Sequence, residues 1–136
     1  MNSASTAEKK AAILIVDDQP ENVQLMAGVL ATNGYLTLAA HSGREALEIL
    51  KTQPADAVLL DMLMPGMDGF EVMHRIRENP KTAGIPILVI TAMWISDEDR
   101  TRIQREAQGI LQKGTFWIEE LLKEVARVLG AGSAAR

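Results

Sequence analysis

The sequence contains no cysteine in its 136 residues. This excludes disulfide bonds and thiolate metal sites, and it favours an intracellular, cytoplasmic location. Positive charge is also scarce, because 14 Lys and Arg stand against 18 Asp and Glu, for a formal net charge of −4. This charge balance gives no excess of positive charge that would attract DNA or an anionic membrane, so direct nucleic-acid binding is not expected.

Long apolar stretches are missing as well. No run approaches the length of a membrane span, and residues 1–10 lack the apolar segment of a signal peptide, so membrane insertion is not expected. Apolar residues form 47% of the chain and charged residues 24%, which is typical of a soluble globular protein. The length suits one domain. We expect it to span residues 11–130, between flexible tails at 1–10 and 131–136.

Short apolar runs predict the strands. Residues 12–16, 57–60 and 85–90 are unbroken apolar runs, typical of strands buried on both faces of a parallel sheet. Residues 36–40 alternate and residues 110–111 are short, so these two strands suit the sheet edges. Helical patterns separate the strands. The alternation predicts an α/β fold: a flavodoxin-like, doubly wound, five-stranded parallel sheet in the order 2-1-3-4-5, with helices on both faces.

Local signals mark where the helices begin and end. Ser42 and Glu45 form a capping box for the second helix, while Gly34 and Pro80 end the first and the third. The segment 96–107 is helical in composition but carries few apolar residues. We expect it to be the least firmly docked helix, because little of it can pack against a core.

Asp61 follows the apolar run 57–60, and the chain then turns through Pro65, Gly66 and Gly69. In open α/β sheets, ligands bind in the crevice at the carboxyl ends of the strands, so this carboxylate is placed for chemistry. An aspartate at such a position can instead simply cap the following turn. This stretch alone gives the two interpretations similar weight.

Four more polar residues close or directly follow predicted strands, namely Asp17, Asp18, Thr91 and Lys113. Each alone has a plainer explanation, such as a helix cap, a strand-end hydroxyl or a solvated lysine. The fold, however, gathers them with Asp61 at one sheet edge, where three carboxylates repel one another unless a hard divalent cation, Mg²⁺ or Mn²⁺, neutralises them. Lys113 and Thr91 offer a positive charge and a hydroxyl to an anion. The set describes a phosphoryl pocket with Asp61 as nucleophile.

Over residues 10–130 the sequence resembles the receiver domain of two-component response regulators. The segments that carry the resemblance are 16–18, 61–69, 89–92 and Lys113. The resemblance implies that Asp61 receives a phosphoryl group from a phosphohistidine on a sensor histidine kinase or a histidine phosphotransfer protein. It also implies that Thr91 and Lys113 contact the phosphoryl group once it is in place.

The same resemblance assigns the metal ligands and two tuning positions. Asp17, Asp18, Asp61 and the backbone carbonyl of Leu63 would hold Mg²⁺. Leu63 and Met93 occupy the positions that flank the water that hydrolyses the acyl phosphate, and both are apolar. Neither can orient a water by hydrogen bonding, so we expect a long-lived phosphoryl group.

Two positions depart from the family pattern. Gly114 follows Lys113 where the family usually has proline, and Ile110 stands where the family often has an aromatic switch residue coupled to Thr91. A threonine–aromatic switch of the usual kind is therefore not expected. Trp94, in the loop after Thr91, could anchor a partner or fold back on its own loop.

The leading hypothesis is a single-domain, phosphorylation-dependent signalling switch that acts by contact with a downstream protein, without independent substrate turnover. It would work as a monomer or a phosphorylation-linked dimer, through the helix 96–107, the last strand and the final helix. Alternatives are a phosphorelay intermediate or phosphate sink, a receiver module of a hybrid histidine kinase, and a pseudo-receiver that only binds partners.

An aspartate-nucleophile phosphatase of the haloacid dehalogenase type represents a different class of function. That family places its nucleophile in an Asp-x-Asp motif after the first strand. Here the first strand ends in adjacent Asp17 and Asp18, and the candidate nucleophile follows the third strand. The arrangement argues against this class.

Overall fold

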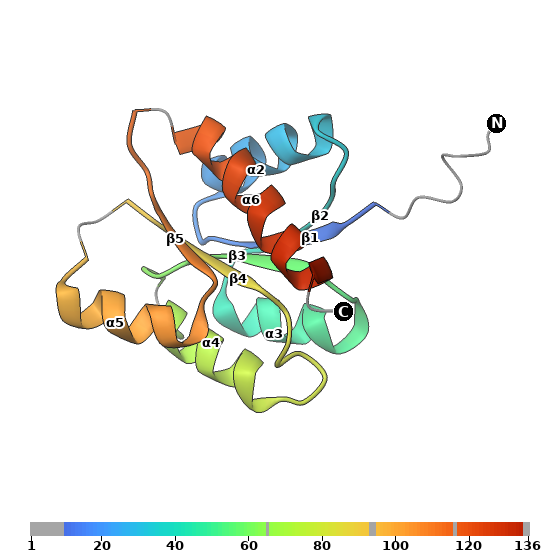
Figure 1. Cartoon of the computed structure of the whole chain (residues 1–136). Coiled ribbons are helices and arrows are strands. Elements are labelled where there is room, and N and C mark those ends of the chain that lie inside the picture. The colour runs from blue at the N-terminus through green and yellow to red at the C-terminus, as the bar shows by residue number, and fades with distance from the viewer. Residues whose placement is uncertain (1–9, 65, 93–94, 116, 135–136) are drawn as a thin grey trace.

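A computed structural model of the protein describes residues 10–64, 66–92, 95–115 and 117–134. Within these residues, five strands form one sheet in the order β2-β1-β3-β4-β5, and every neighbouring pair is parallel (Figure 1). The strands are β1 (Ala12–Val16), β2 (Leu36–Ala40), β3 (Ala57–Asp61), β4 (Ile87–Thr91) and β5 (Gly109–Gln112). The predicted strand order and the two predicted edge strands are confirmed.

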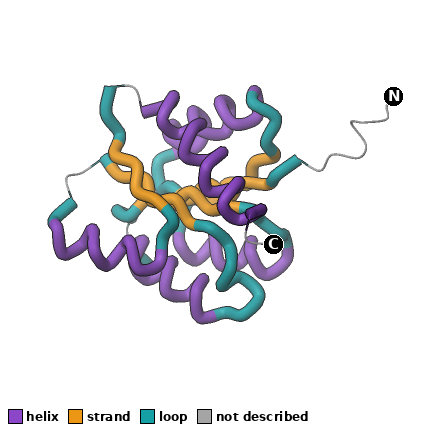
Figure 2. The backbone as a smooth tube through the Cα atoms, viewed as in Figure 1, coloured by secondary structure: helices purple, strands orange, loops and turns teal. Residues whose placement is uncertain are grey.

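Helices cover both faces of the sheet (Figure 2). The helices are α2 (Pro20–Thr32), α3 (Gly43–Thr52), α4 (Gly69–Glu78), α5 (Asp97–Glu106) and α6 (Trp117–Ala134). Side chains of α2 and α6 pack on one face, and those of α3, α4 and α5 pack on the other. Of the described helices, none has both the length and the hydropathy needed to cross a membrane.

Several element boundaries differ from the prediction, and those of β4 and α6 have a physical reason. Strand β4 begins at Ile87 rather than at residue 85, because Pro86 has no N–H to give to the sheet; its carbonyl still accepts a bond of 2.9 Å from the Val58 N–H. Helix α6 continues to Ala134, past the expected domain end at residue 130. The residues beyond Gly130 include no proline that would stop a helix.

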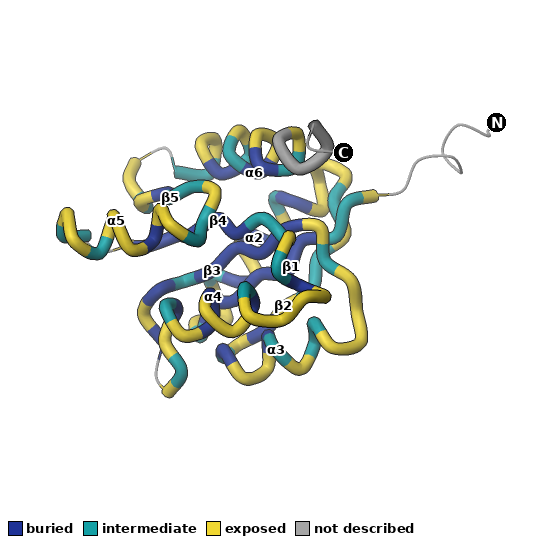
Figure 3. The backbone as a smooth tube through the Cα atoms, turned by 60° about the horizontal axis from the view of Figure 1, so that its bottom comes forward, coloured by how far each residue is buried: buried dark blue, intermediate teal, exposed yellow. Residues whose placement is uncertain are grey.

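The central strands β1, β3 and β4 are buried on both faces (Figure 3). Alternate residues point to opposite faces, so Leu14 and Leu60 belong to the core under α3 and α4, while Ile15 and Leu59 belong to the core under α2 and α6. Burying each such side chain stabilises the fold by about 1.5–3 kcal/mol. These strands therefore form a firm base from which the polar residues at their ends project.

Helix ends follow the expected signals. The Ser42 hydroxyl accepts a hydrogen bond of 3.1 Å from the Glu45 N–H, and the Glu45 carboxylate accepts one of 2.7 Å from the His41 N–H. Gly34 follows the end of α2 with a φ of 91°, which glycine adopts cheaply. Asn79 is extended at the end of α4, directly before Pro80.

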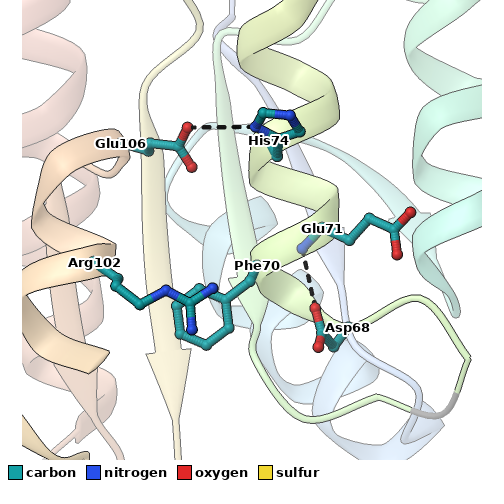
Figure 4. Close-up of a pocket in the computed structure, with 6 residues that line it drawn as sticks. All are labelled: Asp68, Phe70, Glu71, His74, Arg102 and Glu106. Atoms are coloured by element: carbon teal, nitrogen blue, oxygen red, sulfur yellow. Dashed lines mark hydrogen bonds and ion pairs between the residues drawn. The ribbon is translucent and has the colours of Figure 1, made fainter. Parts of the chain in front are cut away.

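Helix α5 buries little apolar surface. Among its described residues, Ile103 is the buried one. A hollow of about 400 Å³ lies between α4 and α5, and beside it the Arg102 guanidinium stacks 3.8 Å from the centroid of the Phe70 ring (Figure 4). Across the same hollow, His74 Nδ1 lies 4.0 Å from Glu106 Oε2. Arg102 and His74 are exposed, while Phe70 and Glu106 are partly buried, so these contacts add little to the docking of the helix.

Arg77 of α4 supplies a polar attachment that the hydrophobic pattern does not reveal. Its Nε and Nη2 donate to the Glu106 carbonyl at 2.9 and 2.6 Å, and its Nη1 donates to the carbonyls of Ala83 and Ile85 at 2.8 and 2.6 Å. Nη2 also donates to Gln108 Oε1 at 2.9 Å. One guanidinium therefore joins α4, the loop before β4 and the C-terminal end of α5.

We predict that Arg77→Met destabilises the fold by about 2 kcal/mol, because several carbonyl oxygens lose their donor while the aliphatic stem is kept. Urea unfolding followed by circular dichroism measures the loss. Arg75→Met is the matched control on the same helix: Arg75 pairs with Glu71 at 3.0 Å in an exposed position, so its loss should cost no more than about 0.5 kcal/mol. Equal losses in the two variants would contradict this role of Arg77.

Candidate functional site

The predicted site residues come together at the carboxyl ends of the strands. Asp17 directly follows β1, Asp61 ends β3, Thr91 ends β4 and Lys113 directly follows β5. Because all these strands are parallel, their carboxyl ends lie on the same side. Asp18, next to Asp17, completes the acidic group. The structure therefore brings together all five residues that the sequence singled out.

Asp17, Asp18 and Asp61 form a compact acidic cluster. One carboxylate oxygen from each lies within 4.8 Å of the other two, a separation that one cation could bridge. Asp17 is 1% exposed, and its Oδ1 accepts a hydrogen bond of 2.9 Å from the Gln19 N–H. Its Oδ2 has no hydrogen-bond partner in the described part of the chain. A buried carboxylate oxygen left without a donor suits a metal ligand.

Asp61 is partly buried, and its Oδ1 accepts a hydrogen bond of 3.1 Å from the Leu63 N–H. Burial raises the pKa of Asp61 from 3.8 to about 6, although the Leu63 hydrogen bond opposes the rise. The charge of Asp17 raises this pKa further, and that of Lys113 lowers it. A cation bound at the cluster would favour the ionised form that a nucleophile requires.

The turn after Asp61 is closely packed against the start of α4. A Cβ on Gly69 would lie 2.5 Å from Met62 Sδ and 2.7 Å from Met62 Cα, so only glycine fits without a shift. Gly66 has a φ of 79°, which also favours glycine. Asp68 caps α4 by accepting a hydrogen bond of 3.0 Å from the Glu71 N–H. The turn is therefore held at both its strand and its helix end.

Lys113 lies at the site although glycine follows it. Its backbone N–H donates to the Thr91 carbonyl at 2.9 Å, and its Nζ is 3.6 Å from Asp17 Oδ2. Nζ also lies 5.3 Å from the centroid of the Trp117 ring. Sequence reasoning had not connected Trp117 with Lys113. The signal available in the sequence was their spacing of four residues.

Of the other positions that the sequence singled out, Ile110 and Leu63 lie within the described residues. Ile110 is partly buried in β5 and packs against the core under α3 and α4. Leu63 has a side chain that is 53% exposed, and its carbonyl as a metal ligand stays a prediction. Met93 and Trp94 lie outside the described residues.

A family model for the response regulator receiver domain matches residues 13–126. The chain belongs to this family. Receiver domains act in two-component signalling, and the flavodoxin-like fold and the acidic cluster agree with the assignment. The resemblance inferred from the sequence motifs is thereby confirmed.

Similar proteins cover most of this chain. Protein PilH of Pseudomonas aeruginosa is 30% identical over 121 residues, which are 88% of this chain and 98% of PilH. The structure of chemotaxis protein CheY4 from Vibrio cholerae matches with a TM-score of 0.82 and 33% identity, covering 88% of this chain and 99% of CheY4. Both matches extend over most of this chain and over nearly the whole of the relative.

A longer relative matches more strongly over a shorter stretch. A probable cyclic di-GMP phosphodiesterase of Vibrio cholerae is 51% identical over 79 residues, which are 58% of this chain. The chain spans 18% of the length of that protein. The similarity therefore concerns one part of the relative, and the activity in its name is a statement about that protein.

We predict that Asp61→Asn stabilises the metal-free protein at pH 7.5. A carboxyl group with a folded-state pKa of about 6 and an ordinary value of 3.8 binds its proton more tightly in the folded state, so it destabilises the fold once it is ionised in both states. Because Asp61 is only partly buried and solvent screens its charge, we expect a gain of about 1 kcal/mol.

The gain should shrink as the pH falls below 6 and vanish well below 3.8, where Asp61 is protonated in the unfolded state as well as in the folded state. Urea unfolding of both proteins in a chelator, at a series of pH values, measures it. A difference that stays constant over this range would show that the charge of Asp61 is not its source.

Proposed function

We propose that the protein is a phosphorylation-dependent signalling switch in which Asp61 accepts a phosphoryl group from a phosphohistidine. The donor is a sensor histidine kinase or a histidine phosphotransfer protein. The observation that carries the proposal is the joint position of the acidic cluster and Lys113, whose Nζ lies 3.6 Å from Asp17 Oδ2. Membership of the receiver family supports the same chemistry.

The transfer is a displacement at phosphorus. A carboxylate oxygen of Asp61 forms a bond to phosphorus while the bond between phosphorus and the imidazole nitrogen breaks, and the imidazole keeps the electron pair. The Leu63 N–H, donating to Asp61 Oδ1, orients the carboxylate. Lys113 places a positive charge where the phosphoryl oxygens arrive, and Thr91 ends the neighbouring strand with its hydroxyl.

The acidic cluster fits a divalent cation, Mg²⁺ or in its place Mn²⁺. Asp17, Asp18, Asp61 and the Leu63 carbonyl would hold it, and the buried Oδ2 of Asp17, without a hydrogen-bond donor among the described residues, supports this ligand set. When bound, the ion supplies positive charge that stabilises the oxygens of the transferring group. The rest of the site orients the carboxylate and the lysine.

The output is proposed to be a protein contact made by α5, β5 and α6, with a downstream partner or a second copy of the chain. Helix α5 buries a single residue among those described, so it is an element that a small change at the site could displace. We infer no independent substrate turnover and a cytoplasmic location. We place the working unit at residues 11–130.

Acetyl phosphate with Mg²⁺ should add one phosphoryl group to the wild-type protein, detected by intact mass measurement. Asp61→Asn should take up none, because an amide is not a nucleophile for this transfer. Asp56→Asn is the matched control: Asp56 lies just before β3, at its opposite end, where its Oδ2 accepts a hydrogen bond of 2.7 Å from the Ala12 N–H. It should be phosphorylated normally. An unmodified wild-type protein would overturn the proposal.

The double variant Leu63→Asn, Met93→Glu should lose its phosphoryl group about tenfold faster or more, because polar side chains can orient the attacking water. Radiolabelled phosphate release measures the rate. Leu25→Asn is the control: Leu25 is 46% exposed on α2, similar to the 53% of Leu63, so the same substitution should leave the rate unchanged. An unchanged rate in the double variant would show that these positions do not set the phosphoryl lifetime.

A further inference from the structure

We propose that Trp117 is a positioning residue whose indole ring holds the Lys113 ammonium beside the acidic cluster. The Nζ atom of Lys113 lies 5.3 Å from the centroid of the Trp117 ring and 3.6 Å from Asp17 Oδ2. Both contacts exist together in the same arrangement. The ring therefore favours the lysine position that the phosphoryl site needs.

Among the described residues, the Lys113 side chain contacts the Asp17 carboxylate and the Trp117 ring. The backbone is tied by the hydrogen bond of 2.9 Å to the Thr91 carbonyl, but the stem of four carbons beyond it can rotate. Gly114 adds no side chain, and a Cβ placed there would meet nothing within 4 Å. The residue after the lysine therefore cannot brace the stem. An aromatic ring that holds the ammonium supplies the missing restraint.

Trp117 is itself well anchored. It begins α6 and is partly buried, and it packs against the core under α2 and α6. Leu121, one turn further along the same helix face, is fully buried in that core. The ring is thus fixed by the helix and the core together. A fixed ring can restrict a flexible ammonium, whereas a mobile one could not.

The local environment strengthens the contact. An ammonium within about 6 Å of an indole centroid is attracted by the negative face of the ring, and the attraction grows when water is excluded. The Lys113 side chain is only 15% exposed. Losing the ring should therefore slow phosphorylation of Asp61 about two- to fivefold, since the lysine would spend less time at the site.

The alternative is that Trp117 only fills space in the core. Leucine could then replace it without consequence for Lys113. A test must therefore observe the lysine directly as well as the rate of phosphorylation. The kinetic consequence rests on the proposed function, whereas the contact between the two side chains does not.

The first measurement is NMR of protein labelled with ¹³C at the lysine ε carbons, with Lys113 assigned through Lys113→Arg. In wild type, the ring current of Trp117 should shift the Lys113 ε protons upfield of the other lysines. Trp117→Phe should keep part of this shift, and Trp117→Leu should abolish it. Trp117→Met replaces the leucine variant if that one does not fold. An unshifted Lys113 signal in wild type, or the same shift in all variants, would overturn the proposal.

The second measurement is the rate of phosphorylation by acetyl phosphate with Mg²⁺. Trp117→Leu should be about two- to fivefold slower than wild type, with Trp117→Phe in between or close to wild type. Tyr35→Leu is the packing control, because Tyr35 packs against the same core without being at the site. It should react at the wild-type rate. Equal rates for Trp117→Leu and wild type would overturn the positioning role.

The two measurements separate two kinds of failure. A wild-type protein that takes up no phosphoryl group contradicts the proposed function, and the NMR shift then decides by itself whether Trp117 holds Lys113. A phosphorylated wild type with no ring-current shift contradicts only the role of Trp117.

Discussion

The carboxylates of Asp17, Asp18 and Asp61 repel one another, and the rest of the site depends on how that repulsion is offset. Asp61 ends a strand that is buried on both faces and Asp17 directly follows another, so these two carboxylates cannot move apart without disturbing the core. Burial also raises the pKa of Asp61 to about 6, which disfavours the ionised carboxylate that acts as the nucleophile. The folded chain offers a partial remedy through Lys113, 3.6 Å from Asp17. A cation would complete it.

Much of this could be predicted from sequence because it depends on local patterns. Short apolar runs separated by capped helices specify a parallel sheet, and the order of the strands follows from which of them are apolar throughout. A residue that ends such a strand must then lie at the carboxyl edge. For this reason the sequence alone predicts that Asp61, Thr91 and Lys113 lie together.

The contacts that sequence reasoning missed join residues whose pairing depends on side-chain direction. Arg77 belongs to the polar pattern of α4, and nothing in the sequence says that its guanidinium reaches the Glu106 carbonyl. Trp117 has the same character, since its contact with Lys113 depends on how α6 meets the sheet. The start of β4 was placed too early because hydrophobicity alone cannot register that Pro86 lacks a donor. Such features depend on three-dimensional geometry rather than on periodicity.

The attachment of α5 is uneven along its length. Its last turn is bound through the Glu106 carbonyl to Arg77, while its first turn carries Asp97, Glu98 and Asp99 and contributes no buried residue among those described. A helix fastened at one end pivots more easily than it slides. Any displacement of α5 is therefore expected to be a swing about Glu106, with its largest amplitude near residue 97. The first turn of α5 is also the end that follows Thr91 in the chain, so a change at the phosphoryl site would reach this end of the helix first.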